Sequence, residues 1–232
     1  MWKGILLVLL GACSFGILST IVKLGYHEGF TLGELCSVQA GFGMLALWGI
    51  HVLSGARTYG LKNKDVRTSF ILGSSTGLVS ITYYQSVQYI PASIAIILLM
   101  QFTWMSMLAE WVFYKKRPSA TRWITVVFIL GGTLLAGGIV NQGETRLDWR
   151  GIGFGMLAAI FYTMFIVVSG RVGQSLTPVL KSAWIVTGAF LLITLIFPPV
   201  YLFNGRFTGT SLWVWGLPLA TFGTVLPPFL FS

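Results

Sequence analysis

The sequence has few charged side chains and few cysteines. Only 9% of its 232 residues are charged, compared with about 25% in an ordinary soluble domain, whereas 55% are hydrophobic. So few polar side chains cannot cover the surface of a water-soluble protein, and the composition therefore indicates an integral membrane protein. The two cysteines, Cys13 and Cys36, lie in or beside apolar runs and imply no disulfide framework.

Acidic residues and histidines are also scarce, which excludes several kinds of site. Of the six Asp and Glu residues only Glu110 lies inside an apolar run, and the two histidines, His27 and His51, lie near opposite membrane surfaces. An intramembrane protease needs a Ser–His pair, an Asp pair or a metal motif. The sequence therefore predicts no enzyme, no metal site and no cofactor. The basic residues that follow Glu110 favour an interfacial ion pair for it, and proton coupling is the alternative.

Apolar runs of about 20 residues, the length that crosses a hydrocarbon core as a helix, recur along the chain. They predict an all-α membrane protein, because an open sheet would leave unpaired backbone groups in lipid. The eight predicted transmembrane helices span residues 4–24, 35–53, 68–90, 92–114, 123–140, 151–170, 183–203 and 212–231.

The net charge of +9 comes from basic residues that are unequally divided between the two sets of loops. One set holds eleven: Lys3, Arg57, Lys62, Lys64, Arg67, Lys115, Lys116, Arg117, Arg122, Arg171 and Lys181. The other set holds Lys23, Arg146, Arg150 and Arg206. Cytoplasmic loops carry the excess of Lys and Arg, so we predict a multi-pass protein of the cell membrane with a cytoplasmic N-terminus. The charge is explained by topology, and no nucleic acid partner is expected.

A short motif occurs twice. Residues 149–152, Trp-Arg-Gly-Ile, repeat residues 2–5, Trp-Lys-Gly-Ile, and the apolar run that follows places Tyr162 opposite Phe15. The first copy contains five predicted helices, an odd number, so the second copy enters the membrane from the opposite side. Inverted repeats of this kind build secondary transporters, whose substrate site lies near the midplane where the halves meet.

The repeat divides the chain into two parts. Residues 1–145 form the first copy, with helices 1 to 5, and residues 146–232 form the start of the second, with helices 6 to 8. The second copy lacks counterparts of the last two helices of the first. We therefore expect that the complete protein has ten transmembrane helices.

Two stretches carry a family resemblance. Residues 84–95, Tyr-Gln-Ser-Val-Gln-Tyr-Ile-Pro-Ala-Ser-Ile-Ala, resemble the Y-x-A-L-x-Y-x-P-A-S-x-A junction of the EamA-type branch of the drug/metabolite transporter superfamily, and residues 115–119 stand where that family usually has G-E-R-P-S. The resemblance implies ten helices in two five-helix inverted repeats around a central cavity. Thr103 stands where the family commonly has a proline, which leaves a kink of that helix in question, and Lys116 replaces a usual glutamate.

Polar and aromatic side chains within the predicted helices suggest where a substrate could bind. Residues 73, 77, 80, 84 and 88 share one stripe of a helix, and Gln101 lies near the midplane, where an amide needs a partner. The candidate cavity residues are Ser80, Tyr84, Gln88, Gln101, Trp104 and Tyr162. The alternatives are a bond from Gln101 to a neighbouring helix, ordinary packing of Trp104, and an interfacial belt position for Tyr84.

The sequence thus predicts a secondary transporter that carries or exports small metabolites by alternating access. The amide and aromatic groups suggest a neutral or zwitterionic amphipathic substrate, such as an amino acid. A non-transporting membrane scaffold or sensor is the alternative. The expected partners are the substrate and the lipid bilayer. The glycine pairs at 131–132 and 137–138 could serve the fold or a homodimer, and Pro218 either kinks or ends a helix.

Overall fold

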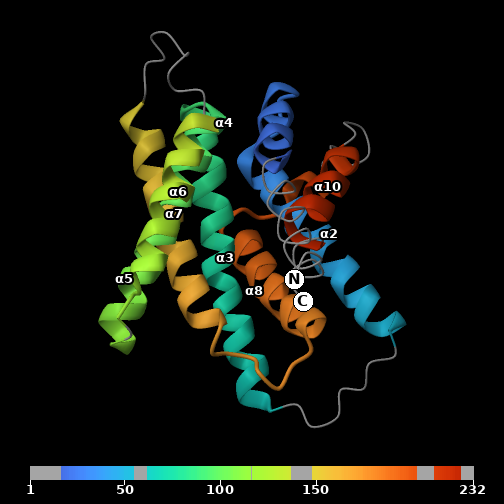
Figure 1. The fold of residues 1–232 in the computed structure, drawn as a ribbon. Helices are drawn as coiled ribbons and strands as arrows, with labels where there is room; N and C mark the ends of the chain where they lie inside the picture. Colours follow the sequence, from blue (N-terminus) through green and yellow to red (C-terminus); the bar gives the residue numbers. More distant parts are fainter. Residues whose placement is uncertain (1–16, 55–61, 116, 137–147, 203–211, 226–232) are drawn as a thin grey trace.

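The computed structural model describes residues 17–54, 62–115, 117–136, 148–202 and 212–225, and within them every regular element is a helix (Figure 1). Residues 17–27 are helical. The further elements are α2 (Leu32–Leu53), α3 (Asn63–Tyr89), α4 (Ala92–Met100), α5 (Phe102–Tyr114), α6 (Ala120–Ala136), α7 (Trp149–Ser169), α8 (Pro178–Ile196), η2 (Val200–Leu202), α10 (Leu212–Ala220) and the π-helical η3 (Thr221–Val225). The predicted helical class is confirmed.

Several helices begin earlier than the apolar runs indicate. The predicted start of the second helix at 35 was wrong, because Thr31 and Glu34 form a capping box that starts α2 at Leu32. The seventh was predicted at 183–203, but Thr177 caps α8 and Pro178 occupies its first turn. α8 ends at Ile196 because prolines follow Phe197, and helical backbone geometry is disfavoured for the residue before a proline.

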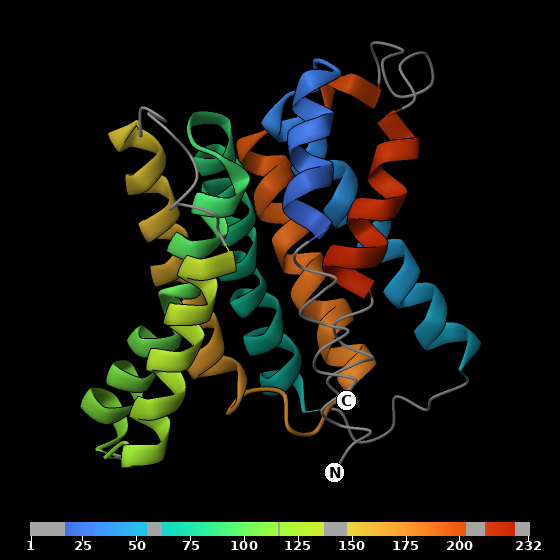
Figure 2. The ribbon, with the colours of Figure 1, turned by 45° about the horizontal axis from the view of Figure 1, so that its top comes forward.

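The polar helix α3 lies in the middle of the structure. It packs against α7 and α8, while α2 packs against α8 and α10, and α4 and α5 cover α7. Both ribbon views place α4–α7 on one side of α3 and residues 17–27, α2 and α10 on the side of α8 (Figure 1 and Figure 2). Because α7 and α8 cover two sides of α3, many of its Ser, Thr, Tyr and Gln side chains can find polar partners away from lipid.

Within the described residues, helices lie at the positions of the predicted spans, while residues 4–16, 137–140, 203 and 226–231 of those spans lie outside the described residues. Four of them are long and apolar enough to cross a membrane by length and composition: Leu32–Leu53, Ala92–Tyr114, Trp149–Ser169 and Pro178–Ile196. Successive helices also alternate in direction, so that α3 and α8 run upward and α2, α7 and α10 run downward in Figure 1. The multi-pass architecture is consistent with this arrangement, and the number of spans stays a prediction.

The contact between α3 and α8 is made by backbone atoms. A Cβ atom added to Gly73 would lie 2.0 Å from the carbonyl oxygen of Ile185, and one added to Gly188 would lie 2.0 Å from the carbonyl oxygen of Phe70. No side chain fits between the helices at this point. Gly73 and Gly188 therefore allow the backbones of α3 and α8 to approach each other directly. By contrast, an added Cβ at Gly131 or Gly132 on α6 meets nothing within 4 Å.

The fourth predicted helix is interrupted at Gln101, between α4 and α5. The backbone N–H of Gln101 donates to the carbonyl oxygen of Leu98 at 3.2 Å, three residues back, and the Thr103 hydroxyl donates to the Met100 carbonyl. Hydroxyl bonds of this kind compete with the helical ladder and bend helices. The interruption therefore occurs without the proline that Thr103 replaces.

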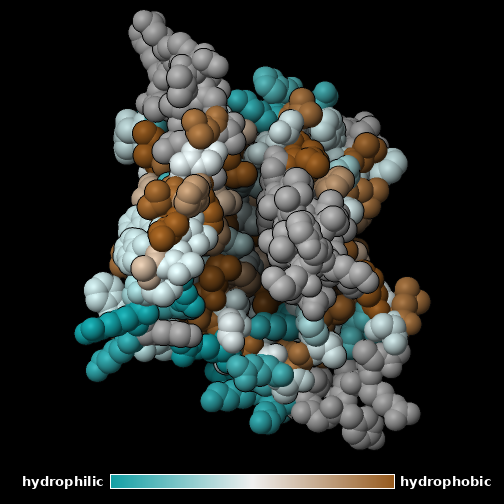
Figure 3. Space-filling view, viewed as in Figure 1, coloured by the Kyte–Doolittle hydropathy of each residue, from teal (hydrophilic) through white to brown (hydrophobic). Residues whose placement is uncertain are grey.

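Basic side chains gather at one end of the bundle, where α2 ends, α3 begins and the connection from α7 to α8 passes. In Figure 3 the largest group of strongly hydrophilic residues lies at this lower end, a smaller group lies at the top, and apolar residues are frequent between them. The described basic residues of this end are Lys62, Lys64, Arg67, Lys115, Arg117, Arg122, Arg171 and Lys181. The charge asymmetry expected from the loops is thus present in the fold.

We predict that Gly73→Ala and Gly188→Ala each destabilise the protein by about 1–3 kcal/mol, because the added methyl group overlaps backbone atoms of the partner helix. Gly153→Ala on α7 is the matched control, since nothing lies within 4 Å of its added Cβ. Thermal unfolding in detergent measures the difference. Equal melting temperatures for the Gly188→Ala and Gly153→Ala variants would contradict the backbone contact.

Candidate functional site

Three buried or half-buried polar side chains meet where α2, α3 and η3 come together. The Tyr84 hydroxyl donates to Oε1 of Gln39, and Nε2 of Gln39 lies 3.4 Å from Oγ1 of Thr224, to which it donates. Tyr84 is only 1% exposed and Gln39 only 7%. We call these three residues the Gln39 cluster. It joins helices that are far apart in the chain, with Thr224 in the predicted second copy and the other two in the first.

Glycines let the elements of the Gln39 cluster approach one another. A Cβ added to Gly223 would lie 2.5 Å from Nε2 of Gln39, and one added to Gly43 would lie 2.5 Å from Cγ2 of Thr224. Pro218 lies inside α10, and the chain continues into the π-helical turn η3. Pro218 therefore does not end the helix. π-helical turns occur frequently at functional sites, because they redirect side chains within a helix.

Tyr84 is also held through its backbone. The hydroxyl of Tyr26 donates to the carbonyl oxygen of Tyr84 at 3.0 Å. Within α3 a carbonyl is already an acceptor for the helix, so this bond is an additional one from the helix at residues 17–27. Tyr84 is therefore positioned from two sides, and it does not occupy an exposed interfacial belt.

A second group of predicted site residues lies at the interruption between α4 and α5. The Gln101 amide donates to the carbonyl oxygen of Ile97 at 3.1 Å, and its Oε1 accepts from Nε1 of Trp104 at 2.8 Å. Phe102 lies edge-on to Tyr162 of α7, with ring centroids 4.5 Å apart. Gln101 thus bonds within its own helix in the described structure and not across to a neighbour. Trp104 and Tyr162 lie in the same α4–α5–α7 region.

The remaining two predicted residues have different surroundings. Ser80 is half-buried on α3, one turn before Tyr84. Gln88 is exposed near the end of α3, where it accepts from Nε2 of Gln85 at 3.0 Å. The described structure therefore places Tyr84 in the Gln39 cluster and groups Gln101, Trp104 and Tyr162 elsewhere, whereas Gln88 lies with neither group.

Sequence reasoning missed Gln39 and Thr224. The signal for Gln39 was present, since it is an amide in the middle of the apolar stretch of α2 and must find a partner there. Thr224 gave no comparable signal, because a threonine hydroxyl can bond to its own helix. Only the fold shows that this threonine faces α2.

The Gln39 cluster consists of neutral groups that can both donate and accept hydrogen bonds. An amide has two donor hydrogens and two acceptor lone pairs, and the bonds found within the described residues use one of each on Gln39. The cluster can therefore recognise a polar ligand through hydrogen bonds. No group of three metal-ligating side chains occurs in the described part of the chain.

At the basic end, two contacts join the segment between α7 and α8 to the helices α5 and α3. The guanidinium of Arg171 lies 3.1 Å from the ring centroid of Tyr114, at the end of α5. Asp65, before the apolar part of α3 begins, accepts from the backbone N–H and the hydroxyl of Ser175. The hydrogen bond from the Ser175 hydroxyl holds the pKa of the Asp65 carboxyl below its usual range.

Residues 2–138 match the description of the EamA-like transporter family, and this match covers more than half of the chain. The chain belongs to the EamA-like transporter family. The family match covers the first copy, including Gln39, Tyr84, Gln101 and Trp104. The resemblance inferred from residues 84–95 is thereby confirmed.

Relatives of this EamA-like chain are named as transporters. It is 26% identical over 217 residues to the uncharacterized transporter sll1319 of Synechocystis sp., covering 83% of this chain and 66% of that protein. It is 29% identical over 160 residues to the threonine/homoserine exporter RhtA of Escherichia coli K12, covering 67% of this chain and 49% of RhtA. The chain thus spans less than two-thirds of the length of these relatives. No solved structure gave a significant match.

We predict that Tyr84→Phe lowers the free energy of unfolding of this EamA-like chain by about 1–3 kcal/mol, because the buried Oε1 of Gln39 loses its donor. Tyr89→Phe is the matched control, since Tyr89 lies on the same helix but is exposed. Thermal unfolding of the two variants in detergent measures the cost. A Tyr84→Phe variant as stable as Tyr89→Phe would show that the Gln39 bond does not contribute.

Proposed function

We propose that the chain belongs to a secondary transporter that moves a small neutral or zwitterionic metabolite by alternating access. The observation that carries the proposal is the Gln39 cluster, a buried set of hydrogen-bonding side chains between helices of the two predicted copies. Buried polar groups within a membrane protein are costly and by default mark a functional site. The membership in a transporter family supports the same conclusion.

The proposal includes the inverted repeat, with residues 1–145 as the first copy and residues 146–232 as the start of the second. Two reciprocal contacts support it. The third helix of the first copy, α3, packs on α8, which is the second helix of the other copy, and α10 packs on α2 in the corresponding way. The opposite directions of α2 and α8, and of α3 and α10, agree with inversion (Figure 1). The complete protein of ten helices remains part of the proposal.

Amino acids with a polar side chain are the substrate class that we favour. The Gln39 cluster carries no charge, but its amide and hydroxyl groups can bond to a carboxylate, an ammonium or a hydroxyl. The name of RhtA gives threonine and homoserine, two hydroxyl-bearing amino acids, as what that relative exports. Gln101, Trp104 and Tyr162 are proposed to line the path of the substrate beside α4, α5 and α7.

Alternating access requires contacts that form at one end of the bundle and break when that end opens. The Tyr114–Arg171 and Asp65–Ser175 contacts join the two copies at the basic end, so we propose that this end is closed in the present conformation. The glycine contact between α3 and α8 supports a rocking motion, because the helices meet there without interlocking side chains.

Counterflow in proteoliposomes tests transport, with protein made from the complete natural reading frame and labelled threonine, homoserine and other amino acids. We expect accumulation of at least one amino acid. Gln39→Ala should reduce its uptake by about two- to tenfold, because each lost hydrogen bond weakens substrate binding. Gln174→Ala, in the exposed connection between α7 and α8, is the control and should leave uptake unchanged.

A negative result would favour the alternative function. The folded protein could take up no amino acid of the panel, and no nucleoside or cationic drug tested in the same way. This result would favour the interpretation of the protein as a scaffold or sensor. If transport is present but Gln39→Ala and Gln174→Ala behave alike, the Gln39 cluster is not the substrate site.

The orientation is tested separately by cysteine labelling. In a background with Cys13→Ser and Cys36→Ala, Gln174→Cys should react with a membrane-impermeant maleimide only from the cytoplasmic side, because basic loops remain in the cytoplasm. Glu28→Cys, exposed at the opposite end of the bundle, should react only from outside. The reverse pattern would contradict the cytoplasmic placement of the basic end.

A further inference from the structure

A groove with charged residues at its outer end lies between α5 and α6. Its volume is about 290 Å³, about ten times the roughly 30 Å³ that one water molecule occupies in the liquid. The lining residues are Thr103, Ser106, Met107 and Glu110 of α5 and Arg122, Thr125, Val126 and Ile129 of α6. We call this the α5–α6 groove. It is separate from the Gln39 cluster and from the group around Gln101.

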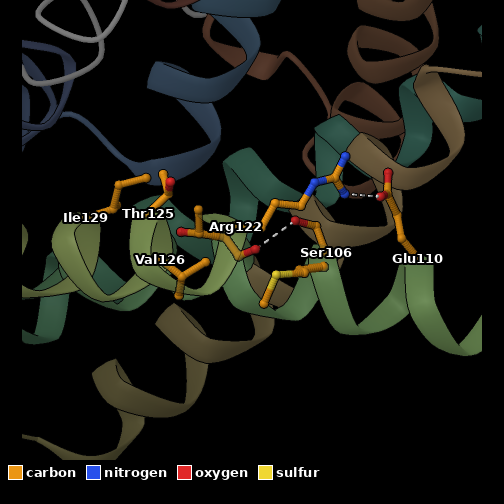
Figure 4. A pocket seen from close by; sticks show the side chains of 8 residues that line it. Ser106, Glu110, Arg122, Thr125, Val126 and Ile129 are labelled. Atoms are coloured by element: carbon orange, nitrogen blue, oxygen red, sulfur yellow. Dashed lines mark hydrogen bonds and ion pairs between the residues drawn. The ribbon is translucent and has the colours of Figure 1, made fainter. Parts of the chain in front are cut away.

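The charges of the α5–α6 groove lie at its outer end. Nη1 of Arg122 lies 3.2 Å from Oε2 of Glu110, and both side chains point toward each other across the helices (Figure 4). Glu110 therefore forms an ion pair, as the sequence predicts, but its partner within the described residues is Arg122 and not the basic residues at 115–117 that directly follow its helix. The side chains of Arg122 and Glu110 are 50% and 37% exposed, and one contact joins them. A guanidinium has five donors and a carboxylate about four acceptor positions, so both retain capacity for a ligand.

The surroundings of the groove are consistent with a position of this ion pair near lipid headgroups. Trp111 and Trp123, which directly follow Glu110 and Arg122 in the sequence, are 45% and 43% exposed. Tryptophans are enriched at the membrane–water interface. On α6 the exposed large apolar side chains include Val127 and Phe128, further from the basic end, whereas on α5 Val112 and Phe113 are exposed near that end. The outer surface of this helix pair is therefore suited to contact with lipid.

The walls of the groove change in character with depth. Thr103 lies seven residues before Glu110, which corresponds to about 10 Å along a helix. Between these levels the walls are formed by hydroxyl groups and by the apolar side chains of Met107, Val126 and Ile129. The groove thus offers opposite charges at its outer end and hydroxyl groups mixed with apolar side chains further in, which suit a phospholipid headgroup, its ester groups and the start of its acyl chains.

We propose that the α5–α6 groove binds a phospholipid with a phosphoethanolamine headgroup. The phosphate pairs with Arg122, and the primary ammonium donates to Glu110. An anionic phosphatidylglycerol would satisfy Arg122 but meet repulsion from Glu110. A phosphatidylcholine has no N–H to donate to the carboxylate. The choice of headgroup therefore follows from one cation and one anion placed side by side.

Native mass spectrometry of the purified, delipidated chain tests this inference after addition of phosphatidylethanolamine, phosphatidylglycerol and phosphatidylcholine in equal amounts. We expect phosphatidylethanolamine to be retained in preference to the other two. Glu110→Gln should weaken its retention by about 1.5- to fivefold, the range for one exposed ion pair, and strengthen the retention of phosphatidylglycerol, which no longer meets a negative charge. Arg122→Gln should weaken the retention of both lipids.

Two further variants separate the groove from general electrostatic attraction and from loss of folding. Arg117→Gln removes an exposed cation from the same end of the bundle but outside the groove, so lipid retention should not change. The exchanged pair Glu110→Arg with Arg122→Glu keeps one cation and one anion, and it should retain the preference for phosphatidylethanolamine. Preference for phosphatidylglycerol, retention of no lipid, or equal losses in Arg117→Gln and Glu110→Gln would overturn the proposal.

Discussion

The position of α3 between α7 and α8 is the constraint on which the rest of the structure depends. A helix with so many hydroxyl and amide groups cannot face lipid, because each unpaired group in hydrocarbon costs several kcal/mol. Packing on two sides gives these groups partners, such as the bond from Ser86 to the Gly151 carbonyl at 2.7 Å and that from Ser75 to the Phe161 carbonyl at 2.9 Å. The apolar helices can then occupy the outside.

These bonds also explain how the two predicted copies are held together away from the charged contacts at the basic end. The hydroxyl groups of α3 bind backbone carbonyls of α7, while glycines bring α3 to α8 at backbone distance. Such contacts are short-ranged and depend on small side chains more than on buried apolar area. The interior of this membrane protein is thus held together by hydrogen bonds between α3 and α7 and by the close approach of α3 and α8 at glycines.

The helical class and the approximate positions of the helices were predictable, because hydropathy and length constrain a membrane helix strongly. The ends of α2 and α8 were not, since their polar first turns lie outside the apolar runs. Tyr84 and Trp104 could be proposed from their place within helices. The partnership of Tyr84 with Gln39 could not, because 45 residues separate them and only the tertiary fold brings them into contact.

The π-helical turn η3 gives the proposed site a geometry in which the contact between Thr224 and Gln39 depends on the local helix type. A π-turn holds one residue more than an α-turn, so its conversion to α geometry would turn the side chains within it about the helix axis. Thr224 would then swing away from Gln39, and the amide would lose its partner. A change of register over five residues could thus couple the occupancy of the Gln39 cluster to the movement of one helix, with no hinge in a loop.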